Sequence, residues 1–133
     1  MESRLFTVSE ANAMLPALRE ELGKLQALVS DIEDKYTELK RAKREQHSEP
    51  SVAVDLFFEE EGVIEFMKME ADLMLGNFHR QGVLVKSISP GLLDFPGLLG
   101  EESILLCWKE GEERITHYHG WHDGFIGRKP LAE

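Results

Sequence analysis

The residues best suited to chemistry lie close together near the C-terminus, between positions 107 and 128. This stretch holds three of the five histidines, both tryptophans and the single cysteine of the chain. In a strand, side chains two positions apart point to the same side, so His117 and His119 would present two imidazoles together. His122 could fold back as a third ligand. Such a group predicts a site for a divalent metal such as zinc or iron.

A carboxylate from Asp94 or from Asp123 could complete that site. Asp94 is the only charged residue in a stretch of prolines and glycines, and Asp123 follows His122 directly. Asp94 is also a candidate for binding an anionic ligand together with Arg128 and Trp108, because a guanidinium grips carboxylates and phosphates with two parallel hydrogen bonds. The alternative is structural. Arg128 would then form a buried salt bridge with Asp94 and fix the tail to the preceding loop.

Cys107 could act as a thiolate ligand or a nucleophile. A tight turn at Glu110-Gly111 would pair Cys107 with Arg114 and turn it away from His117 and His119, since a shift of one residue moves every side chain to the other face. Only a three-residue loop with a bulge would bring Cys107 to the histidines. We therefore expect Cys107 to be a small buried apolar residue.

Composition narrows the classes of function. The chain has 25 acidic and 15 basic residues and a formal net charge of -10, so nucleic acid and anionic membranes are unfavourable partners. No apolar run approaches the roughly 20 residues that cross a bilayer. A single cysteine and a charged N-terminal stretch indicate a cytoplasmic protein. Phosphate-binding glycine loops, nucleophile elbows and paired-cysteine zinc motifs do not occur.

The first half of the chain predicts a pair of helices. From position 8 to 39 the apolar residues alternate at spacings of three and four, which is typical of a heptad seam. They are Val8, Ala11, Leu15, Leu18, Leu22, Leu25, Val29, Ile32, Tyr36 and Leu39. Thr7 and Glu10 form a capping box before a helix over 8–45, and Pro16 predicts a kink. A polar linker over 46–53 and a second helix over 54–81 would complete an antiparallel hairpin.

After position 82 the pattern changes to the alternation of strands. It predicts strands over 83–88, 103–108 and 114–119, with an ordered loop over 89–100. We therefore expect a single α+β domain over 1–133. It would consist of the helical hairpin, a small three-stranded antiparallel sheet and an irregular C-terminal tail.

Several segments in this order resemble the bacterial domain-of-unknown-function family 2203. They are Thr7 to Leu18, Gly91 to Pro96, Leu106-Cys107-Trp108, Tyr118-His119 and Gly124 to Pro130. The resemblance covers nearly the whole chain and implies a shared architecture without an assigned activity. The positions it marks as shared are Asp94, Phe95, Cys107, Trp108, His119, Gly124, Phe125, Gly127 and Arg128, whereas His117, Trp121 and His122 lie outside the pattern.

Two functional hypotheses follow. The heptad seam favours a non-catalytic assembly or protein-interaction module, a homo-oligomer or a binder of another protein through the hairpin. The alternative is a small metal-binding or anionic-ligand-binding protein whose site lies in the C-terminal sheet and tail. Whether such a protein would also be an enzyme does not follow from the residues.

Overall fold

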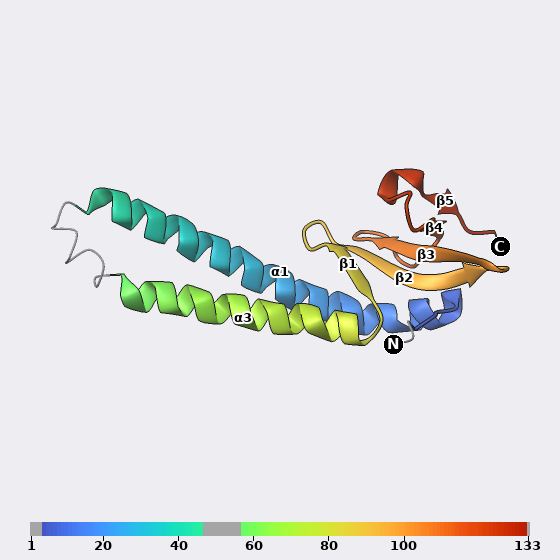
Figure 1. The fold of residues 1–133 in the computed structure, drawn as a ribbon, viewed down its shortest axis with the longest axis horizontal. Coiled ribbons are helices and arrows are strands. Elements are labelled where there is room, and N and C mark those ends of the chain that lie inside the picture. The colour runs from blue at the N-terminus through green and yellow to red at the C-terminus, as the bar shows by residue number, and fades with distance from the viewer. Residues whose placement is uncertain (1–3, 47–56, 133) are drawn as a thin grey trace.

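The computed structural model describes residues 4–46 and 57–132. Two long antiparallel helices, α1 (Val8–Glu45) and α3 (Phe58–Arg80), lead into a five-stranded sheet. The α+β class and the helical hairpin are confirmed (Figure 1). The predicted linker and the predicted start of the second helix at position 54 lie outside the described residues, apart from Gln46, which caps α1.

Helix α1 begins where the sequence predicts. The Thr7 hydroxyl accepts a hydrogen bond from the Glu10 N–H at 3.0 Å, and the Glu10 carboxylate accepts one from the Thr7 N–H at 2.8 Å. Pro16 lies inside α1, and in Figure 1 the first, dark-blue turns of α1 lie at an angle to the rest of the helix. Pro16 removes one helical hydrogen bond and crowds the preceding turn, which is why the helix bends at this point.

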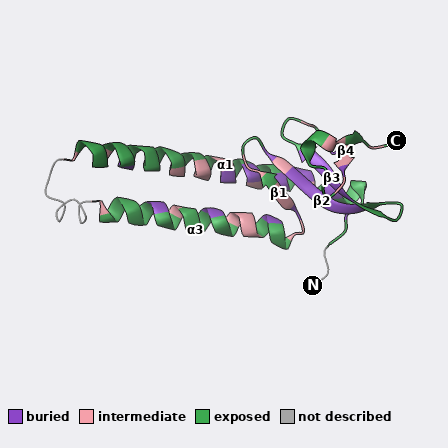
Figure 2. Cartoon of the chain, turned by 45° about the horizontal axis from the view of Figure 1, so that its top comes forward, coloured by how far each residue is buried: buried purple, intermediate pink, exposed green. Residues whose placement is uncertain are grey.

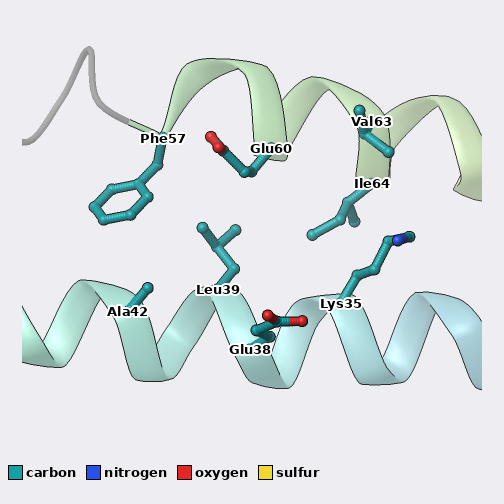
Figure 3. A pocket seen from close by; sticks show the side chains of 8 residues that line it. All are labelled: Lys35, Glu38, Leu39, Ala42, Phe57, Glu60, Val63 and Ile64. Carbon is teal, nitrogen blue, oxygen red and sulfur yellow. The ribbon is translucent and has the colours of Figure 1, made fainter.

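The core lies where α1, α3 and the sheet meet. Buried seam residues of α1, among them Leu18, Leu22 and Leu25, pack with Phe78 of α3 and with Phe95 of the sheet. The other end of the hairpin is mostly exposed, as Figure 2 shows. There the helices line an open pocket of about 400 Å³, and Leu39 and Ile64 are among the residues of its wall (Figure 3). Neither helix carries an apolar stretch that could cross a membrane.

The sheet is antiparallel throughout and its strands follow the order of the chain. They are β1 (Leu84–Ser87), β2 (Leu92–Leu99), β3 (Glu102–Lys109), β4 (His117–His119) and β5 (Lys129–Pro130). The loop predicted over 89–100 is wrong for most of its length, because β2 forms there and pairs with β3 along all eight of its residues.

Pro96 and Gly97 fit inside β2 because of what borders them. Strand β1 pairs only with residues 92–94 of β2, so the second half of β2 has a free side. The segment before α1 lies against that side, and the Phe6 N–H donates to the Pro96 carbonyl at 2.7 Å. Proline is tolerated at position 96 because no partner strand on that side needs a backbone N–H from it. Glycine is required at position 97 because a Cβ atom there would come within 2.9 Å of the Phe6 carbonyl oxygen.

Candidate functional site: a buried aspartate, cysteine and histidine

The sheet has an inner face toward the helices and an outer face under the C-terminal tail. On the inner face, Leu93, Phe95 and Trp108 belong to the main core. On the outer face, Asp94 pairs with Cys107 across β2 and β3, and Cys107 pairs with His117 across β3 and β4. His119 lies two residues further along β4, on the same face.

This register corrects the predicted separation of Cys107 from the histidines. Strand β4 begins at His117, not at Arg114, and Glu110–Thr116 forms the connection after β3. Hydrogen bonds shape that connection: the Trp108 ring N–H donates to the Glu112 carbonyl, and the Asn12 side chain of α1 accepts from the Ile115 N–H. The longer connection changes the parity of the pairing and therefore turns Cys107 toward His117 and His119.

Three potential metal ligands converge on the outer face. One ligand atom each from Asp94, Cys107 and His119 lies within 4.8 Å of the other two, which makes these residues the one such group in the described part of the chain. All three residues are 3% exposed or less. A carboxylate, a thiol and an imidazole that are buried this far from solvent need hydrogen-bond partners, a proton or a cation within the protein.

His119 is oriented from both sides of its ring. Its Nδ1 lies 2.8 Å from the Gly120 carbonyl oxygen, and its Nε2 lies 3.1 Å from the Asp94 Oδ2. Because a carbonyl oxygen only accepts, Nδ1 carries a proton and Nε2 is the nitrogen that meets the carboxylate. In a neutral ring Nε2 then offers a lone pair toward Asp94, so a proton or a cation has to lie between them.

Cys107 is held in its thiol form. The pKa of Cys107 is raised to about 12, first by burial and then by the charge of Asp94, which also accepts a hydrogen bond from the thiol. Arg128 lowers this pKa in part. A thiol with so high a pKa is a poor nucleophile at neutral pH, where it becomes a thiolate only when a positive charge replaces its proton.

Arg128 lies beside this cluster and is paired with other groups. Its Nη2 donates to both carboxylate oxygens of Glu112, at 2.7 and 2.8 Å, and to the Cys107 carbonyl at 3.4 Å. The predicted salt bridge between Asp94 and Arg128 is therefore wrong: Arg128 pairs with Glu112, and Asp94 pairs with His119. The guanidinium also lies 4.8 Å from the centre of the Phe125 ring, which ties the tail over the sheet (Figure 1).

The remaining predicted site residues lie outside the cluster. His117 shares its face, but its Nδ1 lies 2.9 Å from the Thr116 hydroxyl. His122 is exposed in the tail. Asp123 closes a turn by accepting from the Gly120 N–H at 3.1 Å. Trp108 is buried in the main core on the inner face, so it lies on the opposite side of the sheet from Asp94.

A family model described as an uncharacterized conserved protein (DUF2203) matches residues 4–131. The chain belongs to the DUF2203 family. The resemblance inferred from the sequence segments is thus confirmed, and it brings no activity with it. No curated protein and no solved structure matches the chain.

The sequence interpretation missed Cys107 as a member of the cluster and Glu112 as the partner of Arg128. The family pattern contains a usable signal for the first, because Asp94, Cys107 and His119 are the acid, thiol and imidazole among its shared positions. No comparable feature of the sequence indicates that Glu112 would pair with Arg128. Its role depends on the course of the connection between β3 and β4, which no local spacing specifies.

Proposed function

We propose that this member of the DUF2203 family is a divalent-metal-binding protein whose ligands are Asp94, Cys107 and His119. The observation that carries the proposal is the convergence of three buried donor groups of different chemistry within 4.8 Å. The orientation of His119 supports it, since metal-bound histidines commonly donate their other ring N–H to a carbonyl or a carboxylate. Here Nδ1 meets the Gly120 carbonyl and leaves Nε2 for the metal.

The donor set favours zinc or iron(II). Calcium and magnesium prefer all-oxygen sites, whereas thiolate and imidazole suit borderline ions. A nitrogen and an oxygen bound at about 2.0 Å in tetrahedral geometry stand roughly 3.3 Å apart. The Nε2 to Oδ2 distance of 3.1 Å is close to this value, so only a small movement of the two side chains is needed.

Three protein ligands leave one coordination position for water or a substrate atom. A cytosolic setting suits the site, because a reducing compartment keeps Cys107 free to act as a ligand. Metal binding has to displace the thiol proton of Cys107, whose pKa is about 12, so metal affinity rises with pH.

The test is metal analysis of the untagged protein, followed by titration of the metal-free form with zinc and with cobalt(II). We expect one metal per chain and, with cobalt, a near-ultraviolet charge-transfer band from a thiolate ligand. His119→Gln and Cys107→Ser should each weaken binding, and Cys107→Ser should abolish the band. His122→Gln is the matched control, since His122 is exposed.

Two outcomes would contradict the proposal. One is a folded parent protein that takes up neither zinc nor cobalt. The other is equal loss of metal in His119→Gln and His122→Gln, which would indicate nonspecific binding by surface imidazoles. Circular dichroism on each variant separates the loss of a ligand from the loss of the fold.

A further inference from the structure

Helix α3 is apolar on two opposite faces, and residues 4–46 and 57–132 cover only one of them. Ile64, Ala71 and Phe78 are buried toward α1 and the core. Phe58, Phe66, Met69 and Leu73 are 74%, 69%, 62% and 66% exposed. At about 100° per residue these four fall within an arc of roughly 80° on the side of the helix away from α1. We call them the outer stripe.

The described part of the chain leaves most of the outer stripe exposed. Leaving four large apolar side chains in water on one helix face is unfavourable, and contiguous apolar patches on soluble proteins mark interaction sites. From Phe58 to Leu73 the stripe extends about 22 Å along the helix, which matches roughly four turns of a second helix. Gly62 lies in line with the stripe, with no atom within 4 Å of where a side chain would begin.

The stripe is bordered by negative charge on both sides. Glu59 and Glu70 follow one edge, and Glu65 and Asp72 follow the other, all of them exposed. The nearest base on α3, Lys68, is already paired with Glu65 at 3.6 Å. A second copy of α3 would bring carboxylates against carboxylates, which disfavours self-association through this face. The same borders repel anionic lipid surfaces.

We propose that the outer stripe of α3 binds an amphipathic helix of another protein, with apolar residues on one face and lysine or arginine along both edges. Apolar contact would supply affinity, and the opposed charges would select the partner and its orientation. This inference is independent of the metal site. It makes the protein-interaction hypothesis specific, because it names the outer stripe of α3 as the surface and a basic amphipathic helix as the partner.

The test uses two synthetic helical peptides of about 15 residues. Both carry leucine along one face, but one has lysine and the other glutamate at the flanking positions. Binding to the full-length protein is followed by fluorescence anisotropy. We expect the lysine peptide to bind, the glutamate peptide not to bind, and the double variant Phe66→Ser, Leu73→Ser to weaken binding by roughly tenfold or more. The charge-reversed variant Glu70→Lys, Asp72→Lys should weaken it as well.

The control is Tyr36→Ser with Glu33→Lys, which removes one exposed aromatic and one carboxylate from α1 instead. Its affinity should equal that of the parent. Unchanged binding by the Phe66, Leu73 variant or equal binding of both peptides overturns the proposal. A second result would also overturn the proposal: the parent protein forms a dimer in sedimentation and the Phe66, Leu73 variant does not. The outer stripe would then bind a second copy of this chain. Attachment to anionic vesicles that depends on Phe66 and Leu73 would overturn the proposal too.

Discussion

At the scale of single residues, the protonation of Cys107 decides what the buried cluster can do. Its raised pKa follows from burial and from the neighbouring Asp94 carboxylate. In the metal-free protein the Cys107 thiol and the His119 ring both contact the Asp94 carboxylate. A divalent cation would replace the protons that hold these groups together, so proton release and metal uptake are coupled.

The pKa of Cys107 predicts a loss of stability in alkaline solution. The unfolded thiol ionises above its ordinary pKa of 9.0, whereas the folded thiol stays protonated up to about 12. The stabilisation of the folded state by this proton is therefore complete below pH 9 and is lost as the pH rises toward 12. Urea denaturation of the metal-free protein from neutral to alkaline pH should show this loss.

Cys107→Ala is the matched comparison for that prediction. Alanine has nothing to ionise, so the difference in unfolding free energy between parent and variant should shrink with rising pH, at up to about 1.4 kcal/mol per pH unit. A difference that stays constant across this range would show that the thiol is not protected in the folded state.

At the scale of secondary-structure elements, β2 depends on the segment that precedes α1. Residues 95–99 have β3 on one side and no β1 on the other, and the backbone around Phe6 lies along that free side. The close approach requires glycine at position 97, because a Cβ atom there would come within 2.9 Å of the Phe6 carbonyl oxygen. Backbone cannot move aside as a flexible side chain can.

Gly97→Ala should therefore destabilise the protein by about 1–3 kcal/mol, as overpacking in a well-packed region does. Gly23→Ala provides the opposite case, since Gly23 is exposed inside α1 and nothing lies within 4 Å of its missing side chain. Alanine at position 23 should stabilise the protein by up to about 1 kcal/mol. Chemical denaturation of both variants tests the pair. Equal effects of the same sign would refute the steric explanation.

At the scale of the whole molecule, the body around the sheet is tightly packed and the distal arm of the hairpin is not. Most buried residues of α1 lie between positions 11 and 25, next to the sheet. Near the far end Leu39 is still buried against Ile64, but beside the open pocket (Figure 3). Stability should therefore be concentrated in the body.

Truncations at the two ends of the seam test this distribution. Leu22→Ala should cost about 3–5 kcal/mol, because Leu22 is buried between α1 and the sheet. Leu39→Ala should cost about 2 kcal/mol or less, since its surroundings are already open. Urea denaturation gives both values. Native-state hydrogen exchange should in addition be faster in the arm than in α1 near Leu22. Similar losses of unfolding free energy at the two positions would show that stability is not concentrated in the body.

The helices and the class of fold follow from local signals in the sequence. The capping box at Thr7, the alternation of three and four in α1 and the change of period after position 82 each depend on neighbouring residues, and the structure has helices and strands in the regions they predict. Within the predicted seam, Val8 and Tyr36 are nevertheless exposed. The strand β2 was missed because Pro96 and Gly97 are usual loop residues. Their place in a strand depends on the Phe6 backbone, which is far away in the sequence.

The composition of the candidate site was partly determined by the sequence, which marked Asp94 and His119. Its assembly was decided by the tertiary structure. The register between β3 and β4 depends on the connection between them, which a hydrogen bond to Asn12 of α1 helps to hold. This register places Cys107 on the same face as His119. Arg128 pairs with Glu112, which lies in the same connection. The alternation within a strand defines which of its own side chains share a face. The register between strands, which depends on contacts between distant parts of the chain, decides which side chains of neighbouring strands lie together on that face.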